Sequence, residues 1–421
     1  MTNLRNCLFV SLSILTLAGV SSAQDGAALY RTYCAICHEG ARADAQAPSR
    51  EVMKRMSAEQ ILQSLESGSM RQQAVYVLDA KTGCVHWTLE VEASVRSALT
   101  LDARSNGDLV AYFGDQTANV YAVDAKTGRV LWKVEVDEYP HAAITAAPQL
   151  YNGRLFVPVS SREESQVGDP RYPCCQFRGS VVALDATTGR RVWKTYTVSE
   201  TPVPTVKNSI GTQLYGPAGG AIWNTPTIDT TRNVLYVGTG NNFAPPATDA
   251  SDSLVAFDLN TGEIRWVRQV TENDIWNGSC GRPDREAAVC PDKDAPDFDF
   301  TGSPLLVDVG NGRQLIVVGN KSGVIFAFDP DVSGKLVWQR RVAKGGTSGG
   351  VFWGSAADGV NIYAAHADFV AANPDAGGGM SAVELRTGRL VWNVPGAGCA
   401  NMAESFPVMY CSRFRWSKPN E

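Results

Sequence analysis

The sequence predicts an all-β propeller of about six or seven blades that follows a small, incomplete α-helical module. One motif carries the propeller prediction, and its six copies are VYVLDAKTGCVHW, VYAVDAKTGRVLW, VVALDATTGRRVW, LVAFDLNTGEIRW, IFAFDPDVSGKLVW and MSAVELRTGRLVW. Each copy has an alternating apolar strand, an acidic residue, a turn with glycine, and a tryptophan four residues after that glycine. Helical spacing of Ile61, Leu62 and Leu65 carries the prediction of the α-helical module.

The motif tryptophans are expected to pack between neighbouring blades, where one large flat side chain covers a wide apolar contact. They are Trp87, Trp132, Trp193, Trp266, Trp338 and Trp392. Further strand-like segments such as RLFVPVS and NVLYVGTG lie between the copies, which makes about four strands per repeat. That number is typical of a propeller blade and favours it over a solenoid or a sandwich.

The first residues predict export. Arg5 is followed by the apolar run CLFVSLSILTLAGV and by SSAQ, so residues 1–23 are expected to be a signal peptide cleaved after Ala23. The run is short for a membrane span, although a buried N-terminal helix is the alternative. We therefore expect a periplasmic protein without a membrane span. The net charge of −5 and the absence of a basic stripe argue against nucleic acid as a partner.

The stretch YCAICHEG contains Cys34, Cys37 and His38 in a Cys-x-x-Cys-His arrangement. A zinc site needs about four ligands, and no second cluster of matching spacing exists. A thioredoxin-like pair needs a strand before it and a helix after it, and the flanking segments do not have that pattern. In an exported chain the arrangement predicts covalent attachment of haem c, with His38 as an iron ligand.

The sixth iron ligand is expected to be a methionine sulfur. Met70 follows the helix predicted in MSAEQILQSLESGSM and is the first choice, with Met53 and Met56 as alternatives. The closing helix of a small cytochrome is missing, because strand-like sequence begins at once after Met70. The predicted organisation is therefore a signal peptide (1–23), an incomplete cytochrome c-like haem module (24–72), a propeller (73–398) and an irregular tail (399–421).

The ten cysteines of this exported chain point to oxidised pairs. Cys280 and Cys290 delimit a short loop that we expect to be closed by a disulfide. Cys174 and Cys175 are adjacent in the sequence. The pairing of the remaining cysteines stays open.

The turn pattern DAKTGxxxW, the segments YPCCQFRGSVVALDATTG and GPAGGAIWNTPTID, and the haem motif together resemble the quinohaemoprotein alcohol dehydrogenases that use pyrroloquinoline quinone (PQQ). The similarity is greatest to the members that oxidise polyvinyl alcohol, and it covers roughly residues 25–398. The resemblance implies an eight-bladed periplasmic propeller, of which this chain has six motif copies. It also implies PQQ, haem c and Ca²⁺ as cofactors, and an external cytochrome c as the next electron acceptor.

The resemblance also implies which residue is the catalytic base. The family has an aspartate three residues before a glycine, and DFTG matches this pattern with Asp299. Asp297 is the reserve and Asp274, in NDIWN, ranks third. An alternating acid and phenylalanine pattern would also suit a half-buried strand edge.

The implied Ca²⁺ site needs hard oxygen ligands. YVGTGNNFAPP resembles the Gly-Asn-Pro loop of the family and points to Asn241. PVSSREES resembles the Ser-Ser-Gly-Ala-Glu stretch and points to Glu164, with Glu163 as the reserve and an exposed loop as the alternative. Asp299 is the third implied ligand.

The remaining implied residues surround the quinone. Trp223 matches the tryptophan that stacks on the ring, and Lys321, in VVGNKSGVIFAFD, matches the cation beside the quinone oxygens. A disulfide between Cys174 and Cys175 would lie against the cofactor or fasten a loop, and Arg178 would reach a PQQ carboxylate. The expected reaction is oxidation of a secondary alcohol, with polyvinyl alcohol or a similar compound as substrate. The alternative is a non-catalytic propeller that serves as a scaffold for envelope protein assembly.

Overall fold

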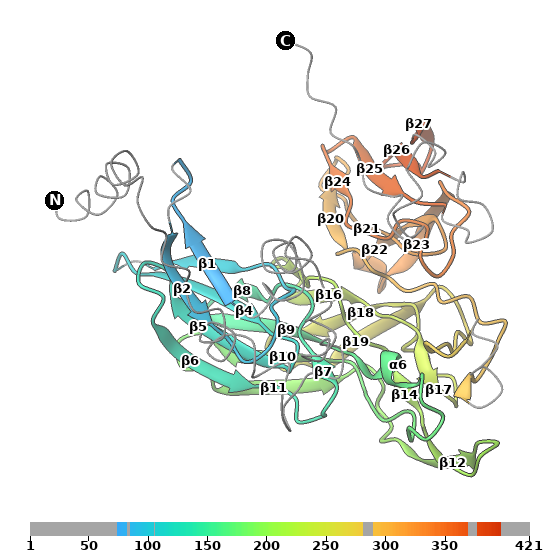
Figure 1. The fold of residues 1–421 in the computed structure, drawn as a ribbon. Helices are drawn as coiled ribbons and strands as arrows, with labels where there is room; N and C mark the ends of the chain where they lie inside the picture. Colours follow the sequence, from blue (N-terminus) through green and yellow to red (C-terminus); the bar gives the residue numbers. More distant parts are fainter. Residues whose placement is uncertain (1–73, 82–84, 105, 281–288, 369–376, 397–421) are drawn as a thin grey trace, which may run out of the picture. The chain divides into compact units, whose positions relative to one another are not determined.

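The computed structural model describes residues 74–81, 85–104, 106–280, 289–368 and 377–396. The chain divides into two units, Met1–Arg71 and Gln72–Glu421, and every described residue belongs to the second. The regular secondary structure of the described residues is almost entirely β-strand, as predicted from the alternating apolar segments (Figure 1). The number of blades stays a prediction.

Six antiparallel sheets follow one another along the chain, and each contains one copy of the repeated motif. The first is a hairpin of β1 (Ala74–Leu78) and β2 (Val85–Glu90). The second contains β3 (Thr100–Ala103), β4 (Leu109–Gly114), β5 (Asn119–Asp124) and β6 (Val130–Glu135). The third contains β7 (Ala142–Ala143), β8 (Gln149–Tyr151), β9 (Arg154–Ser161), β10 (Ser180–Asp185) and β11 (Arg191–Tyr196).

The next three sheets have four strands each, which agrees with the predicted number of strands per repeat. The fourth contains β15 (Thr227–Asp229), β16 (Val234–Gly238), β18 (Ser253–Asp258) and β19 (Ile264–Gln269). The fifth contains β20 (Leu305–Asp308), β21 (Gln314–Gly319), β22 (Val324–Asp329) and β23 (Lys335–Arg341). The sixth contains β24 (Ala356–Ala357), β25 (Asn361–His366), β26 (Gly379–Glu384) and β27 (Leu390–Pro395).

Short elements lie in the connections. Two strand pairs are β12 (Val203–Lys207) with β13 (Gln213–Gly216), and β14 (Ala218–Gly219) with β17 (Asn242–Ala244). The described helices are α6 (Glu163–Gln166) and the 3-10 helix η2 (Pro330–Val332).

The hydrophobic core lies between neighbouring sheets. The two middle strands of a sheet, such as β9 and β10, are almost wholly buried, whereas outer strands such as β6 and β23 alternate or are largely exposed. Tyr112 of β4 packs in one cluster with Val157 of β9 and Val182 of β10. The apolar runs at the middle strands therefore bury both of their faces, since each sheet is covered on two sides.

The repeated motif joins each sheet to the next. Its acidic residue fastens the turn, because the side chain of Asp185 accepts hydrogen bonds from the backbone N–H groups of Thr187 and Thr188. Its glycine has a positive φ and lies under the tryptophan of the preceding sheet, as Gly189 lies under Trp132. The same glycine-on-tryptophan contact occurs at Gly128 with Trp87, Gly262 with Trp193, Gly334 with Trp266 and Gly388 with Trp338.

These contacts confirm the structural role predicted for the tryptophans. The indole N–H of Trp132 also donates a hydrogen bond to the carbonyl of Ala186 in the next sheet. Trp87, Trp193 and Trp338 make equivalent bonds to Ala125, Leu259 and Leu385. The glycine is required by both its conformation and the close approach of the ring.

We expect Gly189→Ala to destabilise the chain more than Gly153→Ala does. Gly153 has nearly the same φ, +71° against +72°, but a Cβ atom there would contact nothing within 4 Å. A Cβ atom on Gly189 would lie 2.9 Å from the Trp132 ring. The left-handed conformation costs about 1–2 kcal/mol in both variants, and crowding of Trp132 adds about 1–3 kcal/mol in Gly189→Ala only. Urea unfolding of both variants measures the difference, and equal losses would contradict the packing role of the ring.

Candidate functional site

The residues predicted for the site lie at one edge of the sheets. In an antiparallel meander the second and fourth strands end at the same edge, and the first strand starts there. Residues that follow a second strand are Glu164 after β9, Asn241 after β16 and Lys321 after β21. Trp223 and Asp299 lie shortly before the first strands β15 and β20. The topology alone therefore brings five residues from distant parts of the sequence to a common edge.

Lys321 forms the centre of a buried ion network. Its Nζ atom lies 2.6 Å from Oδ2 of Asp299 and 2.8 Å from Oδ1 of Asp297. All three side chains are at least 94% buried. Burial disfavours the charged ammonium, but Asp299 and Asp297 outweigh this effect and raise the pKa of Lys321 above its usual value. Lys321 is therefore a permanent cation that fixes both carboxylates.

Asp299 has a second anchor on the neighbouring sheet. Its Oδ1 atom accepts a hydrogen bond of 2.7 Å from the backbone N–H of Asn241. Gly240 makes room for this contact, since a Cβ atom there would lie 2.8 Å from Asp299 Oδ1 and 3.5 Å from Trp223 Nε1. The side-chain NH₂ group of Asn241 donates hydrogen bonds to the carbonyls of Asn242 and Trp276. Among the described residues, no group donates a hydrogen bond to its side-chain oxygen.

Trp223 lies beside the ion network. Lys321 Nζ is 5.2 Å from the centre of its ring and 5.7 Å from the centre of the Phe352 ring. The Trp223 and Phe352 rings are nearly perpendicular, with their centres 5.9 Å apart. An aromatic surface thus lies next to a buried cation, Lys321, and the carboxylate that it contacts, Asp299.

The two glutamates of α6 have different environments. Glu164 belongs to the electrostatic group of the site: burial first, then the charges of Asp299 and Asp274, raise its pKa to about 7 against the opposing effect of Lys321. Glu163 is fully buried and accepts hydrogen bonds from the hydroxyls of Tyr139 and Tyr172. The choice of Glu164 as the metal ligand, with Glu163 as its reserve, stays a prediction.

Asp274, the third choice for the base, has a positioning role in the structure. It is fully buried, and its carboxylate accepts hydrogen bonds from the backbone N–H groups of Asp297 and Phe298. Its backbone carbonyl accepts from the N–H of Asn242. Asp274 thereby fastens the segment that carries Asp297 and Asp299 to the loop that carries Asn241.

Asp252 is a further acidic residue of the site that sequence analysis missed. Its side chain is fully buried, and its carboxyl group lies within hydrogen-bonding reach of the Asp274 carboxyl group. Burial, with the charges of Asp274 and Asp299, raises the pKa of Asp252 well above its usual value. No signal in the sequence marks it, because DASDS reads as an ordinary polar turn ahead of β18.

The predicted disulfide between Cys280 and Cys290 is confirmed, and Cys174 and Cys175 form a second one. Both Cys174 and Cys175 are buried, and Cys175 Sγ lies 3.9 Å from the carbonyl of Phe243. Asn277 was not predicted, yet its amide reaches Cys174 Sγ, at 3.9 Å, and the carbonyl of Phe243. The Cys174–Cys175 loop therefore packs against the segment that follows Asn241.

The structure does not bring Arg178 to this group. Its Nη1 atom donates to the carbonyls of Val198, Ser199 and Glu200, and its guanidinium lies 3.7 Å from the centre of the Tyr196 ring. It lines a separate pocket. The expected contact of Arg178 with a PQQ carboxylate has no support in this arrangement.

The predicted haem ligands lie outside the described residues. They are Cys34, Cys37, His38 and Met70, with the alternatives Met53 and Met56. No helix among the described residues is long and apolar enough to cross a membrane.

A Ca²⁺ ion fits the charge and the donor chemistry of the site. Five acidic side chains interact electrostatically in this group, and Lys321 is the single cation described among them. The five are Asp252, Asp274, Asp297, Asp299 and Glu164. Glu164, Asn241 and Asp299 offer the oxygen donors that this ion prefers. Within the described part of the chain, no three His, Cys, Asp or Glu side chains converge closely enough to hold a metal by themselves. The amide oxygen of Asn241 and atoms of a bound cofactor would have to complete the coordination.

The cofactor-free chain is expected to lose stability as the pH rises from 4.5 to about 7. The folded state raises the pKa of Glu164 from 4.5 to about 7 and so holds its proton to a higher pH than the unfolded chain. The free energy of unfolding therefore falls as the pH rises through this window and levels off above it. Asp252 and Asp297 act in the same direction. Glu164→Gln should reduce the loss by about 1–3 kcal/mol, measured by urea unfolding at each pH. An unchanged slope, equal to that of the exposed control Glu263→Gln, would contradict the shift.

Comparison with known proteins places the chain among proteins with these repeats. The PQQ_2 family profile, described as outer membrane protein assembly factor BamB, matches residues 66–348 and 178–404. A polyvinylalcohol dehydrogenase of Pseudomonas sp. is 43% identical over 76% of this chain and 50% of its own length. One from Sphingopyxis sp. is 40% identical with the same coverage. The chain thus spans about half the length of these curated relatives.

Solved structures share the fold. The quinohemoprotein alcohol dehydrogenase ADHIIG of Pseudomonas putida HK5 matches with a TM-score of 0.54 and 19% identity, over 77% of this chain and 57% of that one. The enzyme of Comamonas testosteroni matches with a TM-score of 0.53 and 18% identity, over 78% and 59%. The repeats, the fold and the two polyvinylalcohol dehydrogenases together show that the chain belongs to the family of PQQ-type propeller proteins that includes the quinohaemoprotein alcohol dehydrogenases.

Proposed function

We propose that the chain is part of a periplasmic quinohaemoprotein that oxidises secondary alcohols, with polyvinyl alcohol or a similar compound as substrate. The buried network of Asp299, Lys321 and Asp297 beside Trp223 carries this proposal. Burying three charged groups costs free energy, and a purely structural propeller gains little from it. Such a network is typical of a site in which a carboxylate must be held in one position.

Each residue has a defined task in the proposed reaction. PQQ, when bound, would supply the acceptor for the hydride of the alcohol carbon. Asp299 takes the proton of the hydroxyl group at its carboxylate, which Asn241 N–H and Lys321 hold in place. Lys321 contributes fixed positive charge where negative charge develops. Trp223 provides the flat face against which the ring would lie, and the buried surroundings exclude water.

Glu164, Asn241 and Asp299 would hold Ca²⁺. A divalent cation there would polarise a nearby carbonyl oxygen and offset the excess of buried carboxylates. Glu164 would give up its proton when the ion binds, because a cation favours the ionised carboxylate. Asp252 and Asp274, whose carboxyl groups interact with each other, would keep one proton between them.

Haem c is proposed as the electron acceptor within the chain. Cys34 and Cys37 would attach it covalently, and His38 and Met70 would bind the iron. An external cytochrome c would then take the electrons. The signal peptide proposed for residues 1–23 places the protein in the periplasm, where haem c and disulfides are formed.

A scaffold for envelope protein assembly is the second candidate, favoured by the description of the matching family profile. The two functions predict different effects of replacing the buried charged residues. A scaffold would tolerate neutral replacements of Asp299 and Lys321 together, since binding to other proteins uses the surface. An oxidoreductase would lose its activity.

The deciding experiment uses the full chain, produced in an exporting host that matures haem c. PQQ and Ca²⁺ are added, and a secondary alcohol is then mixed in while the haem absorption is recorded. Reduction of the haem that requires PQQ supports the proposal. A folded, haem-loaded protein that binds PQQ and stays oxidised with every alcohol would contradict it.

A further inference from the structure

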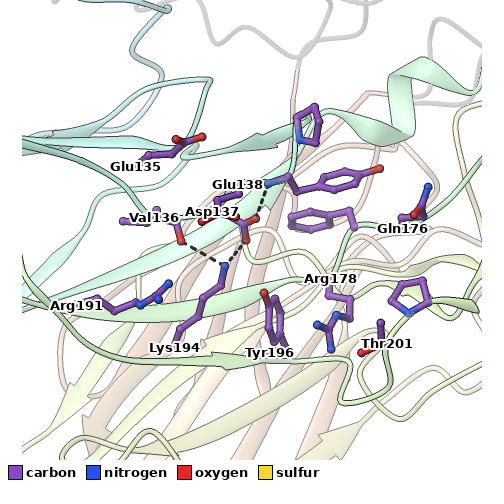
Figure 2. Close-up of a pocket in the computed structure, with 14 residues that line it drawn as sticks. Glu135, Val136, Asp137, Glu138, Gln176, Arg178, Arg191, Lys194, Tyr196 and Thr201 are labelled. Atoms are coloured by element: carbon purple, nitrogen blue, oxygen red, sulfur yellow. Dashed lines mark hydrogen bonds and ion pairs between the residues drawn. The ribbon is translucent and has the colours of Figure 1, made fainter.

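A polar pocket of about 490 Å³ lies between strands of neighbouring sheets, and Figure 2 shows the residues that line it. Its walls come from the loop after β6 (135–140), the segment that follows the Cys174–Cys175 disulfide (176–178), β11 and the loop after it (201–202). The three loop segments follow fourth strands or precede the third strand β10, so they lie at the sheet edge that carries Glu164, Asn241 and Asp299, and β11 runs from the opposite edge toward them. The pocket thus opens at the same edge as the proposed site.

Helix α6 connects the pocket to that site. Glu163 accepts hydrogen bonds from the hydroxyl of Tyr139 and from the backbone N–H groups of Gln176 and Phe177, and these three residues line the pocket. The next residue, Glu164, faces the Asp299 group. Two successive residues of one short helix therefore contact the pocket wall (Glu163) and interact with the proposed catalytic group (Glu164).

Two of the three cationic side chains of the pocket are already engaged. Lys194 Nζ lies 2.7 Å from Asp137 Oδ2 and also donates to the carbonyl of Val136, as Figure 2 shows. Arg178 is occupied by three backbone carbonyls and lies over Tyr196. The six charged lining residues are Glu135, Asp137, Glu138, Arg178, Arg191 and Lys194, so their formal charges cancel. The pocket is therefore suited to a neutral ligand and not to an anion.

The groups left for a ligand are hydrogen-bonding groups over an apolar wall. The side chains of Glu138, Gln176 and Thr201 have no hydrogen-bond partner among the described residues and lie at the exposed rim. Pro140 and Pro202, which are not buried, add apolar surface to the lining. The pocket volume of about 490 Å³ lies in the lower part of the usual range for ligand pockets, about 300–1,000 Å³. It exceeds the volume of one small alcohol and would hold several units of a polymer chain.

We propose that this pocket is a binding subsite for a neutral, hydroxyl-bearing polymer chain, which it holds at units distant from the one being oxidised. The inference rests on the proposed function. Rim hydroxyl, amide and carboxylate groups would bond to the hydroxyls of the polymer, and the surfaces of Pro140 and Pro202 would contact its methylene groups. Binding energy from such remote units lowers the KM for a polymer and not the KM for a small alcohol.

The test compares Thr201→Trp, which fills the rim of the pocket, with Thr187→Trp. Thr187 is also exposed but lies in the β10–β11 turn at the opposite edge of the same sheet. In the full chain loaded with haem, PQQ and Ca²⁺, Thr201→Trp should raise the KM for polyvinyl alcohol about tenfold relative to the KM for butan-2-ol. Calorimetric titration of the PQQ-free chain with polyvinyl alcohol should show about tenfold weaker binding. Thr187→Trp should change neither.

The results separate this inference from the proposed function. If the wild-type chain oxidises butan-2-ol but the Thr201→Trp variant binds the polymer as tightly as wild type, the subsite is wrong and the function stands. Equal weakening by Thr187→Trp would also overturn the subsite. If the polymer binds to the PQQ-free chain, Thr201→Trp weakens it, and no alcohol is oxidised, the subsite is supported and the proposed oxidation is wrong.

Discussion

Replacing Asp299 with asparagine is expected to lower kcat for alcohol oxidation about 1,000-fold, which is within the usual range for loss of a general base. The amide keeps the size of the side chain and can still accept the hydrogen bond from Asn241 N–H, but it cannot take the hydroxyl proton. The KM should change little, because the loss affects the reaction and not the binding of the alcohol. Steady-state kinetics of the full, cofactor-loaded chain measure both constants.

Two further variants make the assignment specific. Asp294 is exposed and lies in the connection between β19 and β20, and Asp294→Asn should retain wild-type kinetics. Asp297→Asn should cost less than Asp299→Asn, because Asp297 contacts Lys321 but lacks the bond to Asn241 N–H. If Asp297→Asn abolished oxidation and Asp299→Asn did not, Asp297 would be the base.

Replacing Lys321 with methionine is expected to destabilise the cofactor-free chain by about 3–5 kcal/mol, the usual cost of removing one partner from a buried ion pair. Two buried carboxylates, Asp297 and Asp299, would then face each other without their shared cation. Methionine keeps most of the volume, so the effect is electrostatic. Urea unfolding at pH 7 measures it.

A double variant tests the cause of that loss. Lys321→Met with Asp297→Asn leaves one carboxylate fewer without a partner and should recover part of the stability, as coupled neighbours do. A double variant no more stable than Lys321→Met would contradict the ion network. Activity should not return with stability, because Lys321 is also proposed to stabilise developing charge.

The repeat predicted the fold well because it encodes contacts between sheets. The glycine and tryptophan of the motif meet across a blade boundary, as Gly189 and Trp132 do, so both residues recur at fixed spacing. The acidic residue recurs because it fastens the turn. These contacts require particular residues at fixed positions, so they leave a pattern in the sequence. The number of blades is not encoded in any single copy of the motif.

The site was predicted in part, for a physical reason. Asp299, Lys321, Asn241, Trp223 and Glu164 were proposed because their segments resemble the family's motifs, and antiparallel topology brings these segments to one edge of the sheets. Asp252 was missed because its environment is created by packing, and nothing in its neighbouring residues indicates burial. The placement of Arg178 was missed because the direction of a side chain beside a disulfide depends on the backbone path, which its spacing from Cys175 does not specify.

The account depends most directly on Asp299 and Lys321 forming a site that binds PQQ and oxidises an alcohol. The most direct measurement is a stopped-flow experiment in which a secondary alcohol is mixed with the full chain carrying PQQ, Ca²⁺ and haem. The account predicts rapid haem reduction in the wild type and about 1,000-fold slower reduction in Asp299→Asn, at equal PQQ content by absorption. Equal rates in the two proteins, or no reduction in a PQQ-loaded wild type, would contradict it.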